Sequence, residues 1–89
     1  MITLKKQIIN KLGLHARASA KFVATAARFQ SQLEVSKDGQ LVNGKSIMGV
    51  MMLGASKGVE LTLSIDGPDE QEMAQSMSLP IDDKFGESE

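Results

Sequence analysis

One segment of this 89-residue chain contains residue types that could transfer a group, the run Gly-Leu-His-Ala-Arg-Ala-Ser at residues 13–19. His15 is the only histidine in the chain, and Arg17 follows it two positions later. A neutral imidazole is a nucleophile, and a guanidinium fits the oxygen atoms of a phosphate group. This pair of residues indicates a phosphoryl group that is carried on His15.

The helix predicted after His15 strengthens that interpretation. Residues 16–28 are rich in alanine and favour a helix, with an apolar stripe formed by Phe22, Val23, Ala26 and Phe29. A helix N-terminus presents unpaired N–H groups and about half a positive charge, which together bind phosphate. A phosphate on the His15 ring would meet those groups. The spacing alone is a weak pattern, however, because a lone histidine at a helix start is more often a cap or a surface residue.

The composition excludes several other chemistries. The chain has no cysteine and one histidine, so disulfides, thiolate metal sites, histidine clusters and a cysteine–histidine pair are all excluded. We therefore expect no metal and no cofactor. A free-standing hydrolase would need an acid–base partner for His15, and no carboxylate lies near it in the sequence. The sequence thus argues against a free-standing hydrolase.

The elements that must position His15 follow from the hydrophobic pattern. Asp38-Gly39 is typical of a tight hairpin turn. Ser46 is placed as the N-cap of a short helix over residues 47–53. A third helix follows Pro68 and is expected to end near Ser78, because Pro80 disfavours its continuation. Alternating apolar and polar residues predict four strands, over residues 2–8, 32–36, 41–42 and 59–65.

The predicted order is β-α-β-β-α-β-α. Four half-buried strands need a cover, and three one-sided helices can supply it. We predict an α+β open-faced sandwich with a four-stranded antiparallel sheet and three helices packed on one face. The whole chain, residues 1–89, is expected to form one domain, with residues 79–89 as a frayed acidic tail.

Charge is unevenly distributed along the chain. Residues 1–65 contain nine Lys/Arg and three Asp/Glu (+6), whereas residues 66–89 contain one Lys and eight Asp/Glu (−7). This pattern fits either a basic face that meets an acidic partner or an ordinary mixed surface with a solvated acidic end. No apolar run approaches the roughly 18 residues of a membrane span, and the N-terminus has no signal-peptide features. We expect a cytoplasmic protein without a membrane partner.

Two segments together resemble one known family. Residues 10–18, Asn-Lys-Leu-Gly-Leu-His-Ala-Arg-Ala, are similar to the active-site segment of the HPr phosphocarrier family of the bacterial phosphotransferase system. Residues 43–53, Asn-Gly-Lys-Ser-Ile-Met-Gly-Val-Met-Met-Leu, are similar to the second signature of that family. Spacing, strand order and chain length agree from about residue 2 to residue 78, so the match is specific.

The resemblance implies a role for each matching residue. His15 would be phosphorylated on Nδ1 by enzyme I and would pass the group to an enzyme IIA-type protein. Ala16 and Arg17 would stabilise the phosphate, and Arg17 would take part in transfer with His15. Ser46 matches a site that a dedicated kinase phosphorylates in some branches. The resemblance further implies a relay protein that is a monomer and binds no nucleic acid, with a partner-docking patch formed by Ala20, Ile47, Met48 and Met51.

Some alternatives remain open at this point. Ile47, Met48 and Met51 could simply pack in the core, although helix geometry allows Val50 and Leu53 to point inward while Met48 and Met51 point outward. A small-molecule-binding regulatory domain of ferredoxin-like topology would share the order of elements. An RNA-binding module of that topology would stack bases on strand aromatics, yet the phenylalanines lie outside the predicted strands.

The chain also departs from the usual family pattern. Many members have proline where this chain has Ala18. The acidic tail with Phe85-Gly86 is similar to the nitrogen-related branch, called NPr, and the resemblance leans towards it. Pro80 is unusual for that branch, because its last helix normally runs on.

Overall fold

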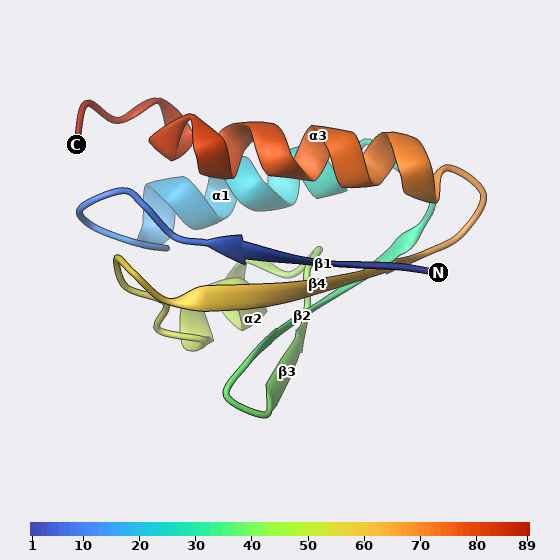
Figure 1. The fold of residues 1–89 in the computed structure, drawn as a ribbon, viewed down its shortest axis with the longest axis horizontal. Helices are drawn as coiled ribbons and strands as arrows, with labels where there is room; N and C mark the ends of the chain where they lie inside the picture. Colours follow the sequence, from blue (N-terminus) through green and yellow to red (C-terminus); the bar gives the residue numbers. More distant parts are fainter.

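The computed structural model describes residues 1–89 as an antiparallel sheet of four strands with three α-helices (Figure 1). The predicted order of elements and the predicted fold class are confirmed. A 3-10 turn, η1, follows the last helix near the C-terminus. In chain order the elements are β1 (Ile2–Gln7), α1 (Ala16–Ala26), β2 (Gln32–Lys37), β3 (Gln40–Asn43), α2 (Ile47–Met52), β4 (Glu60–Asp66), α3 (Glu70–Asp82) and η1 (Lys84–Gly86).

The strands are ordered β1-β4-β2-β3, and every neighbouring pair is antiparallel. Leu63 of β4 therefore lies between Leu4 of β1 and Val35 of β2. A ferredoxin-like sheet would instead place β3 between β1 and β2. The strand order thus separates this fold from the ferredoxin-like alternative.

One face of the sheet and all three helices share a single apolar core. Figure 1 shows α1 and α3 side by side over the strands, and α2 packs against α1. Every second residue is buried along β4 and along residues 32–35 of β2, as the period-two pattern predicts. The buried apolar residues of the sheet and helices are Leu33, Val35, Leu61, Leu63, Ile65, Ala18, Phe22, Ala26, Val50, Met73, Met77 and Ile81.

The predicted end of the third helix near Ser78 is wrong. Helix α3 continues through Pro80 to Asp82, and the N–H of Asp83 donates to the carbonyl of Leu79 at 2.9 Å. Proline removes one helical hydrogen bond, at a cost of about 3 kcal/mol in a helix interior. Ile81 is completely buried. The burial of its side chain next to the core offsets that cost and keeps the last turn helical.

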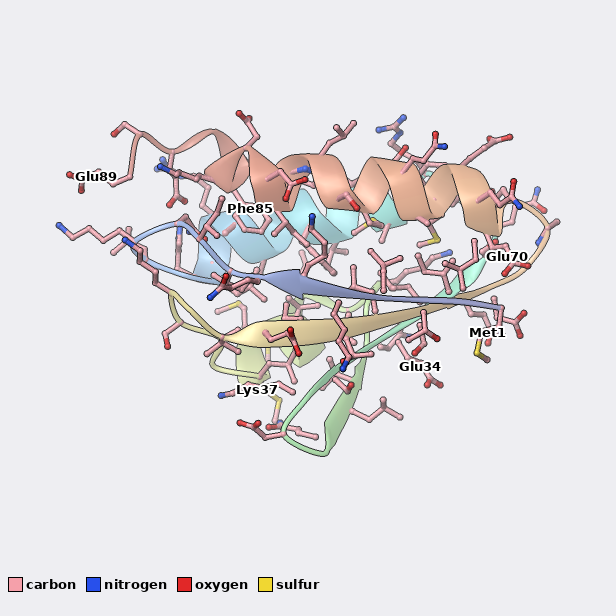
Figure 2. All side chains as sticks on the ribbon, viewed as in Figure 1. Met1, Glu34, Lys37, Glu70, Phe85 and Glu89 are labelled. Atoms are coloured by element: carbon pink, nitrogen blue, oxygen red, sulfur yellow. The ribbon has the colours of Figure 1, made fainter.

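The C-terminal segment also differs from the expected frayed tail. Lys84 and Phe85 take left-handed φ angles of 54° and 55°, which turn the chain back towards α1. Phe85 is 2% exposed, and Figure 2 shows it where the end of α3 lies over α1. The Nζ of Lys21 donates to the Phe85 carbonyl at 2.6 Å. The burial of Phe85 therefore orders the C-terminal segment, although the acidic residues of that segment alone would leave it in solvent.

Candidate functional site

The loop between β1 and α1 holds His15 through contacts with the segment after α2. Gly13 has a φ of 67°, and a Cβ there would lie 2.3 Å from the carbonyl oxygen of Ala55, so only glycine fits. The N–H of Leu14 donates to that same oxygen at 2.9 Å, and the Leu14 side chain is buried. These contacts place His15 at the N-cap of α1, with its side chain free of any capping hydrogen bond.

The start of α1 presents the unpaired N–H groups that the sequence predicted. The first helical hydrogen bond at this end runs from the N–H of Ser19 to the carbonyl of His15 at 2.8 Å. The N–H groups of Ala16, Arg17 and Ala18 precede that bond and have no carbonyl partner within the helix. They point outward from the N-terminus of an 11-residue helix, together with the positive end of its dipole.

An open hollow of about 610 Å³ joins the predicted site residues. His15, Ala16 and Arg17 all line it, so the structure brings together the three residues that the sequence singled out. Leu12, which the sequence analysis did not select, is 66% exposed on the same wall. The full lining consists of Lys11, Leu12, His15, Ala16, Arg17, Glu87, Ser88 and Glu89.

The main residue that sequence reasoning missed is Glu87, whose Oε2 contacts Nε2 of His15. The absence of a carboxylate near His15 holds for the sequence and not for the fold, because the tail returns to the helix start. The amide Nδ2 of buried Asn10 donates to Oε1 of Glu87 at 2.9 Å and to the carbonyl of Gly13 at 2.8 Å. The Asn10 amide first, and then His15, lower the pKa of Glu87 below its ordinary value. The signal that could have revealed this contact was Phe85, a single large apolar residue in a polar tail.

Ser46 caps α2 as predicted. Its Oγ accepts a hydrogen bond from the N–H of Gly49 at 3.0 Å. The predicted inward orientation of Val50 and Leu53 is confirmed, because these side chains are 0% and 2% exposed. The short helix that Ser46 caps therefore has one buried side and one exposed side.

The exposed side of α2 carries the predicted docking residues. Ile47, Met48 and Met51 are 44%, 71% and 39% exposed, so plain core packing does not account for them. Ala20 is exposed on α1, which packs against α2. Met52, which the sequence analysis left out, is 68% exposed and enlarges the same surface. No helix in the structure combines the length and the apolar character needed to cross a membrane.

Comparison with known proteins places this geometry in a family. Residues 2–82 match the family described as PTS-HPr, PTS HPr component phosphorylation site. The chain belongs to the HPr family. A phosphocarrier protein HPr from Cupriavidus necator is 53% identical over 89 residues, and the match covers both chains completely.

Solved structures agree with the family assignment. The crystal structure of HPr-C-His from Thermoanaerobacter tengcongensis has a TM-score of 0.96 and is 48% identical in sequence. The match covers 100% of both chains. A structure described as an HPr dimer from the same organism has a TM-score of 0.78 and 49% identity, over 98% of this chain and 100% of that one. The HPr fold and the phosphocarrier function predicted from the sequence are therefore confirmed. The nitrogen-related branch stays a prediction.

Proposed function

We propose that His15 accepts a phosphoryl group from phosphorylated enzyme I on Nδ1 and passes it to an enzyme IIA-type protein. The observation that carries the proposal is the position of His15 at the N-cap of α1, where it lines the same hollow as Arg17. In the transfer, the bond between phosphorus and its donor atom breaks and a bond from phosphorus to Nδ1 forms. The donor atom leaves with the electron pair of the broken bond.

The start of α1 suits the charge that this step delivers. A phosphoryl group brings close to two negative charges, which the helix dipole and free N–H groups stabilise. In this proposal the N–H groups of Ala16 and Arg17 face the phosphoryl oxygens, and the Arg17 guanidinium contributes a charge-assisted contact. Because these donors are held by the fold, little reorganisation is needed when the group arrives.

The exposed apolar surface beside this site is the proposed docking face. Ala20, Ile47, Met48 and Met51 would contact enzyme I and the enzyme IIA-type acceptor in turn, because flexible methionines adapt to different partners. Phosphorylation of Ser46 by a kinase would add negative charge at the edge of this face. The Ser46 hydroxyl lies at the N-terminus of α2, where a phosphate leaves the helix itself intact.

The central experiment is incubation of the wild-type chain and His15→Ala with enzyme I and phosphoenolpyruvate. We expect the wild type to gain the mass of one acid-labile phosphoryl group and the variant to gain none, with equal circular dichroism spectra. Omission of enzyme I is the control for non-enzymatic modification. Uptake of acid-labile phosphate by His15→Ala would refute the assignment.

Two further measurements address the acceptor and the assembly. Transfer from the phosphorylated chain to enzyme IIA proteins of the sugar and nitrogen branches would identify the branch, and we expect faster transfer to the nitrogen-related acceptor. Light scattering would test the expected monomer. A mass of twice 9.6 kDa would show instead that the chain dimerises.

A further inference from the structure

The C-terminal tail reaches the nucleophile from the far end of the chain. Glu87 lies 72 positions after His15, yet its carboxylate contacts the His15 ring. Figure 1 shows the C-terminus beside the loop that connects β1 to α1. Figure 2 shows Glu89 at this same end of the molecule, where its Oε2 lies 3.4 Å from the Nζ of Lys11.

Several contacts hold the tail in that place. The buried ring of Phe85 anchors it, and its carbonyl accepts a hydrogen bond from Lys21. The N–H of Glu87 donates to the carbonyl of Lys84 at 2.9 Å. The N–H of Lys11 donates to the carbonyl of Glu89, also at 2.9 Å. Glu87 is therefore fixed on both sides along the backbone.

The carboxylate of Glu87 is itself oriented. One oxygen accepts from the amide of Asn10, a residue with no exposed surface, and the other oxygen faces Nε2 of His15. The same Asn10 amide donates to the Gly13 carbonyl, in the loop that carries His15. The side chains of His15 and Glu87 are only 29% and 16% exposed. The buried Asn10 amide thus connects the loop that carries His15 to the Glu87 carboxylate.

We propose that Glu87 is a positioning residue that accepts a hydrogen bond from Nε2–H of His15, leaving the lone pair on Nδ1 free for phosphorus. This inference rests on the proposed function of His15. An ionised carboxylate can only accept hydrogen bonds, so the ring nitrogen that faces it carries the proton. In a neutral imidazole the other nitrogen, Nδ1, is then the nucleophile.

The same contact stabilises the charge that develops during transfer. When the Nδ1 lone pair bonds to phosphorus and the donor bond breaks, Nε2 keeps its proton and the ring gains one positive charge. Glu87 lies beside that charge, as the aspartate of a serine protease triad lies behind its histidine. When the phosphoryl group moves on, the electron pair returns to Nδ1 and the ring is neutral again. The hydrogen bonds from Asn10 and His15, and to a smaller extent the charge of Lys21, lower the pKa of Glu87, which keeps the carboxylate ionised.

The test compares Glu87→Ala and Glu87→Gln with Asp83→Asn as the matched control. Asp83 is an exposed carboxylate at the start of the same tail, and it does not line the hollow that holds His15. We expect Glu87→Ala to slow phosphoryl acceptance from phosphorylated enzyme I about tenfold, the loss of one charge-assisted hydrogen bond. Glu87→Gln keeps an acceptor oxygen without the charge, so its loss should be smaller. Asp83→Asn removes one carboxylate charge in the same way and should stay within about twofold of wild type.

A second readout separates positioning from stability. The ¹⁵N NMR shifts of the unphosphorylated His15 ring near pH 8 report which nitrogen carries the proton. We expect the wild type and Asp83→Asn to show the Nε2–H form alone, and Glu87→Ala to show a mixture of both forms. A slower Glu87→Ala with wild-type ring shifts would overturn the inference, as would a wild-type rate. If the wild type itself took up no phosphate, the proposed function would fail while the ring shifts still reported on Glu87.

Discussion

Phe85 is the anchor of the tail, and its replacement by alanine tests whether tail docking supports the site. The ring is 2% exposed, and removal of a fully buried phenylalanine ring costs about 3–5 kcal/mol in a rigid core. In Phe85→Ala the loss of folding free energy is smaller if residues 83–89 detach from the surface. That response also releases the left-handed φ angles of Lys84 and Phe85, each of which costs about 1 kcal/mol.

The expected net loss is therefore about 1–3 kcal/mol, the difference between these two terms. In a domain of this size that corresponds to a fall in melting temperature of roughly 5–20 °C. The amides of Gly86 and Glu87, which donate to Asp83 and Lys84, should lose their protection from hydrogen exchange. Phosphoryl acceptance by His15 should slow to the rate of Glu87→Ala, because the carboxylate leaves with the tail.

The assays are thermal unfolding, amide exchange followed by NMR, and phosphoryl transfer from enzyme I. Leu79→Ala is the matched control, because Leu79 lies on the last turn of α3, just before the tail, and is 68% exposed. Its stability should change by less than about 0.5 kcal/mol. Unchanged amide protection at Gly86 and Glu87 in Phe85→Ala would show that the tail is held by its polar contacts, and the reasoning from burial would be refuted.

Three other predictions concern Arg17, Ser46 and Asp69. Arg17→Ala should slow phosphoryl transfer about ten- to a hundredfold through the loss of a charge-assisted contact, with an unchanged melting temperature. Unchanged transfer with a lower melting temperature would make Arg17 structural. Ser46→Asp should stay folded but bind enzyme I more weakly in a titration with labelled protein, and equal affinity would remove this face from the docking surface. The hydroxyl of Ser31, and then the N–H of Gln30, hold the pKa of Asp69 below its ordinary value of 3.8. The Asp69 carboxylate binds a proton more readily in the unfolded chain, so its stabilisation of the fold is present above about pH 4 and is lost as the pH falls further. The free energy of unfolding, measured by urea titration, should therefore depend less on acid pH in Asp69→Ala than in the wild type.

Local sequence patterns were sufficient for the order of the elements and for the position of His15 at the start of α1. Clean alternation in β4 predicted its buried face, and an alanine-rich run after His15 predicted α1. The Ser46 cap and the outward side of α2 also followed from positions within one turn of each other. These features depend on hydrogen bonds and side-chain directions between residues close in the chain, so a short window of sequence contains the information.

The tertiary structure alone decided the features that join distant segments. Pro80 predicted a helix end from local geometry, whereas the burial of Ile81 kept the helix intact. The charge of the tail predicted fraying, whereas the packing of Phe85 on α1 brought Glu87 to His15. Such contacts form only when the apolar surface they bury offsets the entropy of closing a long loop. That balance depends on the whole core, and therefore the Glu87 carboxylate beside His15 became visible only in the folded chain.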